Sequence, residues 1–308
     1  MNHSQAAVAF RPVSRASAAA WALMTALVAA LTWSHWSVIT GLFREWRRDP
    51  NYSVGQLVPI AALYLVWTDR HRLKKTPLQP CWWGAAVILV AWAGRAIGLI
   101  SLFESAERYA LVLTVWGLVL LVTGWPFCRK LVWILLFLLL MVPLPGRIHN
   151  MISGPLQDHA TTGAVFGLEL IGIAVNREGH RILLDDTIPI NVAEECSGLR
   201  MLTAFVVVAA TLAYVIRRPR WQKVVLLVSS IPIAIACNVF RLVVTAVLFW
   251  MHHSELGARF FHDFAGVSMM PASVLILLIE LWIMSKLVVP DAPQEGTLGA
   301  DRIANIDS

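Results

Sequence analysis

Long apolar runs alternate with short polar segments along most of this chain. A helix that crosses a bilayer needs about twenty mainly apolar residues, and several of these runs reach that length with few or no charges. We predict eight transmembrane helices, or seven if one of the two short runs is tilted or re-entrant. The expected ranges are 18–39, 54–68, 82–100, 109–125, 131–143, 197–216, 224–250 and 264–288.

The composition supports this interpretation. Hydrophobic residues make up 58% of the chain and charged residues 14%, and the mean hydropathy is +0.67. A soluble domain of this length could not keep so much apolar surface away from water. The sequence therefore predicts an all-α polytopic membrane protein, with a transmembrane domain at 18–288, an N-terminal segment at 1–17 and a polar tail at 289–308.

Lysine and arginine are concentrated in alternate loops, at 70–75, 129–130 and 217–223. Short basic loops are retained in the cytoplasm during insertion, so these loops and both termini should be cytoplasmic. Arg44, Arg47 and Arg48 are an exception on the outer side. Topology and anionic lipid headgroups account for the formal charge of +6, and no basic helix or motif points to a nucleic-acid partner.

The longest interruption between apolar runs is the segment 144–195, which the predicted topology places on the outer side. Its first part, 148–173, has apolar residues at helical spacing and predicts a helix at the membrane interface. Its second part predicts a turn at 176–179, a strand at 181–184, a turn at Asp185 and Asp186, and a return strand over 188–192. Because Pro189 has no N–H group, the return strand should be an edge strand, and we expect it to receive an extended peptide near Asn191.

One cysteine lies where a cysteine can be reactive. Cys196 precedes the predicted helix 197–216, and the positive end of a helix dipole favours a thiolate, although Glu194 and Glu195 oppose this effect. By position alone, Cys196 can equally be a packing residue. No CxxC or Cys/His spacing suggests a metal, and we expect neither a metal nor a cofactor; the other cysteines are Cys81, Cys128 and Cys237.

Arg241 lies inside the predicted helix 224–250, nine residues before Trp250 and so roughly 13 Å from its outer end. An arginine at that depth costs about 2.5–3.5 kcal/mol on insertion scales, so a function or a partner is expected. Asn238 should share its helix face. A structural ion pair with Glu195 or Asp263 is the alternative.

Several histidines fall on the outer side of the predicted topology. His262 precedes the last predicted helix, level with the start of helix 197–216. A thiol, an imidazole and a buried cation on one membrane face would supply a nucleophile, a general acid and base, and an oxyanion stabiliser for acyl transfer. Physical reasoning from the sequence does not choose among the histidines; the others are His159, His180, His252 and His253.

These residues together resemble the exosortase and archaeosortase family of integral-membrane enzymes. The resemblance rests on Glu195-Cys196-Ser197-Gly198-Leu199, then Asn238-Val239-Phe240-Arg241, then His262, with support from the segment 46–53. It implies that Cys196 is the nucleophile, Arg241 the catalytic arginine and His262 the proton-transfer residue. Asn238, Ser197 and Gly198 would support them, and Arg200, Arg181 and Asn191 are weaker candidates for substrate binding.

The resemblance also implies a cysteine peptidase or transpeptidase in a bacterial inner membrane. Its substrates would be exported proteins with a C-terminal sorting signal, made of a short motif such as Pro-Glu-Pro, a hydrophobic helix and a basic tail. The acceptor could be a polysaccharide or a glycolipid, and membrane lipids surround the protein. The alternative is a transporter or scaffold for envelope polysaccharide without covalent chemistry, but the two halves of the chain show no convincing internal repeat.

Overall fold

Eleven α-helices and one short three-stranded sheet are present in a computed structural model of the chain, within the described residues 15–185, 188–191, 198–251 and 269–287. The helices of the first half are α1 (Arg15–Ser34), α2 (Trp36–Arg48), α3 (Leu57–Thr68), the short α4 (Arg70–Lys74), α5 (Trp83–Ile100), α6 (Glu104–Thr123) and α7 (Trp125–Phe137). The second half contains α8 (Gly146–Leu170), α9 (Leu199–Val215), α10 (Arg220–Trp250) and α12 (Met269–Leu287). Two 3₁₀ segments, η1 (Pro50–Gln56) and η2 (Leu138–Met141), connect helices.

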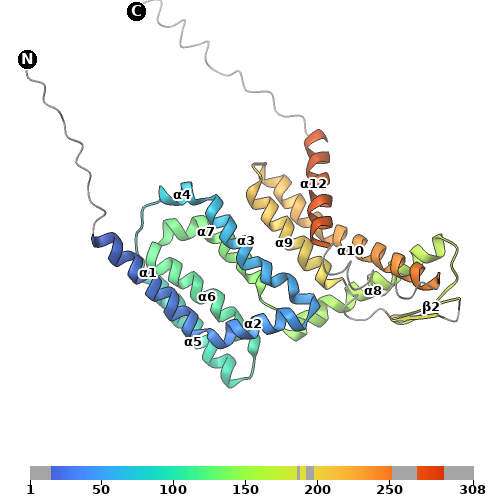
Figure 1. Cartoon of the computed structure of the whole chain (residues 1–308), viewed down its shortest axis with the longest axis horizontal. Helices are drawn as coiled ribbons and strands as arrows, with labels where there is room; N and C mark the ends of the chain where they lie inside the picture. Colours follow the sequence, from blue (N-terminus) through green and yellow to red (C-terminus); the bar gives the residue numbers. More distant parts are fainter. Residues whose placement is uncertain (1–14, 186–187, 192–197, 252–268, 288–308) are drawn as a thin grey trace, which may run out of the picture.

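The helices form two groups that meet at α3 and α9 (Figure 1). In the first group α5 packs along α6, α6 contacts α7, and α3 contacts α7. In the second group α9 packs between α10 and α12, and α8 lies along α10. The 3₁₀ segment η1 also packs against α9, so the segment that follows α2 reaches the second group.

Three helices, α5, α6 and α10, are long and apolar enough to cross a membrane. Two bent pairs raise the number of candidate spans to five: α1 with α2, bent by 65°, and the segment Trp125–Met141 with α8, bent by 81°. The apolar helix α9 is shorter. These are counts over the described residues, and they support a multi-pass membrane protein without establishing eight spans.

The prediction of one continuous helix over 18–39 is wrong, because this range is divided between α1 and α2. The chain bends at His35, where α1 ends and the amphipathic α2 begins. Val38, Leu42 and Trp46 are the buried face of α2, at the spacing of successive helical turns. Neither proline nor glycine lies at the bend, so the sequence carried no signal for it.

The helix predicted at 148–173 is present as α8, which packs closely on α10. A Cβ atom added at Gly163 would lie 2.7 Å from Val239 Cγ2, and one added at Gly167 would lie 2.7 Å from Val243 Cγ2. Small residues one turn apart let two helix backbones approach, as is common between helices in membranes. This contact fixes α8 against the C-terminal half of α10, near Arg241.

Replacing both Gly163 and Gly167 by alanine should destabilise the protein by about 2 kcal/mol, because the β-branched valines opposite have little rotamer freedom. The matched control is Gly94→Ala in α5, where nothing lies within 4 Å of an added Cβ. There the better helix propensity of alanine should raise stability by about 0.5–1 kcal/mol. Thermal unfolding of the detergent-purified protein measures both; shifts in the same direction would refute the close contact.

The three strands are β1 (Val175–Glu178), β2 (Arg181–Leu184) and β3 (Ile188–Asn191), paired antiparallel in the order β1-β2-β3. The turn predicted at 176–179 is therefore wrong, because Asn176, Arg177 and Glu178 pair with β2. Cross-strand pairing here overrides the turn preference of these polar residues. The prediction of an edge strand at Pro189 is confirmed, since β3 pairs only with β2 among the described strands.

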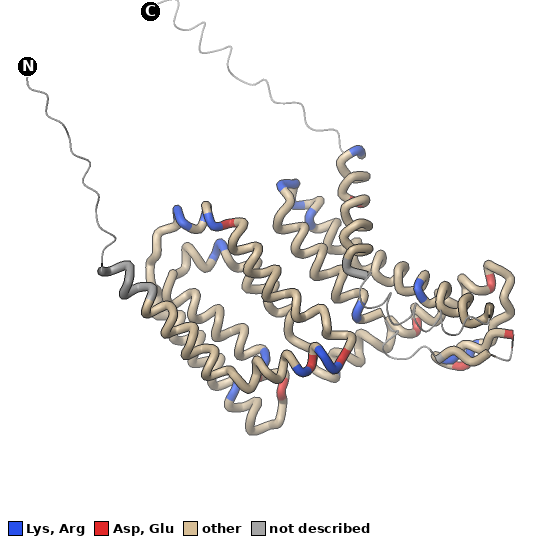
Figure 2. Tube along the Cα trace, in the orientation of Figure 1, with Lys and Arg blue, Asp and Glu red and all other residues tan. Residues whose placement is uncertain are grey.

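The basic segments 70–75, 129–130 and 217–223 lie toward one end of the molecule, although lysine and arginine also occur toward the other end, in α2, α5 and α6 (Figure 2). In this view α4, the start of α7, the connection between α9 and α10, and the end of α12 all carry lysine or arginine toward the top. The bend between α1 and α2, the turn between α5 and α6, and α8 lie toward the opposite end. The three basic loops and the end of α12 thus share one end, as the predicted topology expects, and the basic residues of α2 at the other end are its exception.

Candidate site at the start of the α9 helix

The candidate site begins at Gly198, which caps the N-terminus of α9. Gly198 has φ 90° and ψ 2°, a left-handed conformation that favours glycine because it has no Cβ atom. The chain therefore turns sharply into α9. Cys196 and Ser197 come immediately before this turn and His262 before α12, and all three lie outside the described residues.

Arg241 and Asn238 lie on the buried face of α10, with 3% and 1% of their surface exposed. Arg241 Nη2 donates a hydrogen bond to Asn238 Oδ1 at 2.9 Å, as their spacing of three residues predicts. The Thr245 hydroxyl donates to the Arg241 carbonyl at 2.8 Å. The hydrogen bond to Asn238 therefore restrains the guanidinium inside the helix bundle.

Asn238 also packs directly on Gly198. A Cβ atom added at Gly198 would lie 2.8 Å from Asn238 Nδ2 and 3.0 Å from its Cγ. The side chain that holds Arg241 therefore contacts the backbone at the start of α9. Sequence reasoning placed these two motifs on one membrane face, and the tertiary structure brings the described part of each into contact.

Replacing Gly198 by alanine should lower both stability and activity. The left-handed backbone costs an alanine about 1–3 kcal/mol, and the new methyl group displaces Asn238 and with it Arg241. We expect at least a tenfold loss of activity, on the basis that a displacement of about 1 Å can cost a hundredfold.

Gly172 gives the matched control, because it has φ +85° but nothing within 4 Å of an added Cβ. Gly172→Ala should therefore lower the unfolding temperature without lowering activity in the protein that remains folded. If both variants lost activity in proportion to stability, the contact between Gly198 and Asn238 would have no role in the site.

An apolar cavity of about 390 Å³ lies beside this pair, between α9, α10 and α12. Cys237 and Phe240, which flank Asn238 and Arg241 along α10, line it, together with Met201, Phe205, Ala236, Ala272 and Ile276. The cavity is of the size that binds small apolar groups. No local pattern in the sequence indicates this cavity, because its lining comes from three helices.

The weaker substrate-binding candidates lie on two elements. Arg200 is in the first turn of α9 and is partly buried. Arg181 on β2 is exposed and lies opposite Asn191 on β3 in the strand register. The sheet is fixed to the end of α10 by Trp250, whose Nε1 donates to Asp185 Oδ2 at 2.6 Å.

The segment 46–53 forms buried contacts that sequence reasoning did not predict. Trp46 Nε1 donates to the Met141 carbonyl at 3.0 Å, and the Tyr52 hydroxyl lies 2.5 Å from His149 Nδ1. Burial, reinforced by the Asp49 carboxylate, raises the pKa of Tyr52 to about 12, so its hydroxyl keeps its proton. The first contact joins α2 to η2, the second joins η1 to α8, and η1 also packs against α9.

Among residues 15–185, 188–191, 198–251 and 269–287, no group of three His, Cys, Asp or Glu side chains could hold a metal ion. The described part of the site therefore consists of a buried guanidinium, a carboxamide and a glycine turn beside an apolar cavity. Such a set can bind and polarise a carbonyl oxygen.

The fold and the site define a multi-pass helical membrane protein with a buried polar centre near one end of its bundle. The family model described as transmembrane exosortase (Exosortase_EpsH) matches residues 46–279, most of the chain. The protein belongs to the transmembrane exosortase family. Neither the search of curated proteins nor that of solved structures found a match.

Proposed function

We propose that this protein is a cysteine peptidase or transpeptidase that cleaves C-terminal sorting signals of exported proteins. One observation carries the proposal: Asn238, which binds Arg241, packs on Gly198. Cys196 precedes Gly198 by two residues, so the covalent chain keeps the two Cα atoms within about 7 Å. Membership of the exosortase family supports the same chemistry.

In the proposed reaction the Cys196 thiolate attacks the carbonyl carbon of the scissile peptide bond. The N-terminus of α9 favours the thiolate, because helix dipoles stabilise negative charge at that end. Arg241 stabilises the oxyanion of the tetrahedral intermediate, or alternatively the thiolate itself. When the C–N bond breaks, His262 donates a proton to the leaving amine, and a thioester remains on Cys196.

Release of the product requires a second nucleophile. Water, or an amine or hydroxyl group of an acceptor, attacks the thioester carbonyl, His262 takes up the proton of that nucleophile, and the thiolate leaves. Water gives a peptidase, and an acceptor such as a polysaccharide or glycolipid gives a transpeptidase. Ser197 would support the turn that carries Cys196.

We further propose eight spans in the bacterial inner membrane, with both termini cytoplasmic and the site on the outer side. This orientation is supported by the basic segments 70–75, 129–130 and 217–223, which lie toward the same end of the molecule (Figure 2). The sorting signal would then enter from the outer face. The edge of β3 near Asn191 and Arg181 can pair with its extended part, and the apolar cavity beside Arg241 can take an apolar side chain.

Co-expression with reporter proteins that carry candidate sorting signals and a C-terminal tag tests the proposal. Loss of the tag, followed by mass spectrometry of the new C-terminus, would locate the scissile bond and show whether water or an acceptor was used. If the tag persisted on every reporter while the protein was folded in the membrane, the proposal would fail. A polysaccharide transporter or scaffold would give that result together with a defect in polysaccharide export.

A further inference from the structure

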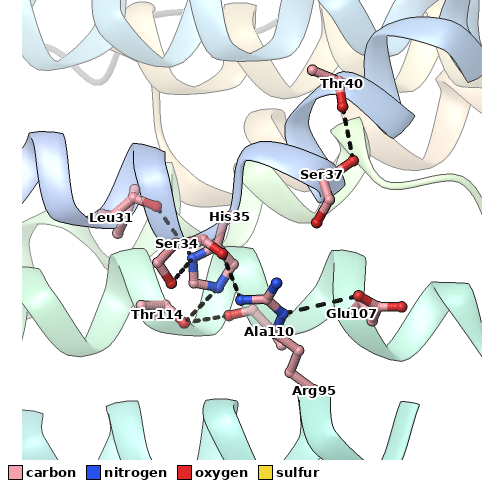
Figure 3. Close-up of polar contacts among 9 residues, drawn as sticks. All are labelled: Leu31, Ser34, His35, Ser37, Thr40, Arg95, Glu107, Ala110 and Thr114. Atoms are coloured by element: carbon pink, nitrogen blue, oxygen red, sulfur yellow. Dashed lines mark hydrogen bonds and ion pairs between the residues drawn. The ribbon is translucent and has the colours of Figure 1, made fainter. Parts of the chain in front are cut away.

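A second polar centre lies at the bend between α1 and α2, away from the proposed peptidase site. His35, with 1% of its surface exposed, contacts Thr114 Oγ1 through Nε2 at 3.5 Å. Arg95 Nη1 donates to the Ser34 carbonyl at 2.6 Å, and Arg95 Nε lies 3.9 Å from Glu107 Oε2 (Figure 3). Ser34 is the last residue of α1, where carbonyls lack partners within the helix, so Arg95 stabilises the bend.

Next to this bend, ion pairs continue along α2 and α6. Arg108 Nη2 lies 2.6 Å from Glu104 Oε2 and 3.7 Å from Glu45 Oε2. The Arg108 side chain is 12% exposed, whereas that of Glu104 is 77% exposed. One end of this ion-pair network is therefore buried and the other is open.

The network borders a cavity of about 260 Å³, smaller than a typical drug-sized pocket but large enough for about nine water molecules. Its charged lining consists of Arg44, Glu104, Glu107 and Arg108, with Ser37 and Leu99 beside them. The two arginines and two glutamates give the lining no net charge. A bound ligand with only a positive or only a negative charge would therefore leave the cavity with an unbalanced charge. A compact zwitterion matches the lining, with its cation at the glutamates and its anion at the arginines.

The surroundings of the cavity are apolar and exposed. Trp36, Phe43 and Leu99 expose 61%, 51% and 55% of their surface, and Ile100 and Leu102 expose 86% and 89%. Exposed side chains of this kind are covered by acyl chains when they lie at the edge of a bilayer. The ligand should therefore combine a zwitterionic headgroup with apolar tails.

We propose that this cavity binds the headgroup of a phosphatidylethanolamine lipid. The ammonium group donates to Glu104 and Glu107, and the phosphate accepts from Arg44 and Arg108. The cavity lies on α2, α5 and α6, whereas Arg241 and Asn238 lie on α10, so the proposal does not depend on the peptidase proposal. Lipid bound here would hold the bend between α1 and α2 at the membrane surface.

The proposal can be tested by native mass spectrometry of the purified full-length protein. The protein is first placed in nanodiscs that contain equal amounts of phosphatidylethanolamine and phosphatidylcholine. The trimethylammonium group of phosphatidylcholine has no N–H donors, whereas the ammonium group of phosphatidylethanolamine has three. The amount of phosphatidylethanolamine retained by the protein should therefore exceed that of phosphatidylcholine about tenfold. Glu104→Gln should abolish this preference. Because Glu104 is mostly exposed and Arg108 keeps Glu45, this variant should still fold.

Arg47→Gln is the matched control, because Arg47 is exposed on the same α2 helix but does not line the cavity. It should keep the preference, whereas Arg44→Gln should weaken retention of both lipids. Soluble phosphoethanolamine should not raise the unfolding temperature, since it lacks the tails. Equal retention of the two lipids, a preference that survives Glu104→Gln, or full stabilisation by the soluble headgroup would overturn the proposal.

Discussion

Cys196→Ala should abolish cleavage of a sorting-signal reporter while leaving the amount and thermal stability of the protein unchanged. Without a sulfur nucleophile no thioester can form, and the remaining groups can only bind the substrate. The measurement is tag loss from the reporter in cells that lack the chromosomal copy. Uncleaved reporter should co-purify with this variant, because binding is retained.

Cys81→Ala is the matched control, since Cys81 is a free, partly buried cysteine between α4 and α5 that does not line the proposed substrate cavity and has no role in the proposed reaction. This variant should cleave the reporter at nearly the normal rate. Trapping with a thiol-reactive reagent would separate the two cysteines further, because only labelling of Cys196 should stop cleavage. Cleavage by the Cys196→Ala protein would rule out the covalent mechanism.

Arg241→Lys should lower activity by about a hundred- to a thousandfold, as is typical when one oxyanion donor is lost. Lysine keeps the positive charge but loses the planar fork that donates to Asn238 while presenting further N–H groups to a substrate. Single-turnover rates of thioester formation with a purified peptide would measure the effect directly. Reporter binding should change much less.

Asn238→Ala tests whether Arg241 must be held in place. Loss of the Asn238 carboxamide removes the 2.9 Å hydrogen bond to Arg241 and the contact with Gly198. We therefore expect the rate of thioester formation to fall to a value between those of the unmodified protein and Arg241→Lys. Arg218→Lys, in the exposed connection between α9 and α10, serves as the control for a change of arginine to lysine. If Arg241→Lys were as active as this control, Arg241 would be a structural residue of α10.

Hydropathy was sufficient to locate most helices, because an apolar run of span length has few alternatives in a bilayer. The predicted ranges 82–100, 109–125, 197–216 and 224–250 correspond to α5, α6, α9 and α10. The 3.6-residue period likewise predicted α8. Helix ends differ by a few residues, since they depend on capping contacts.

The bend at His35 and the strand β1 were not predictable in the same way. The bend depends on Arg95 and Thr114, which are far along the sequence. Strand β1 consists of polar residues, and only pairing with β2 decides its conformation. The sequence contains these residues and their partners, but it does not show which of them meet in the folded protein.

The amino-acid sequence by itself determined that this is a helical membrane protein of the exosortase type, because apolar run length and short motifs are local properties of the chain. It also nominated Cys196, Arg241 and His262, of which the structure describes only Arg241. Only the tertiary structure decided that Asn238 packs on Gly198 and that charged residues enclose a cavity at the α1–α2 bend. Both are contacts between distant segments, and they exist only because helix packing brings those segments together.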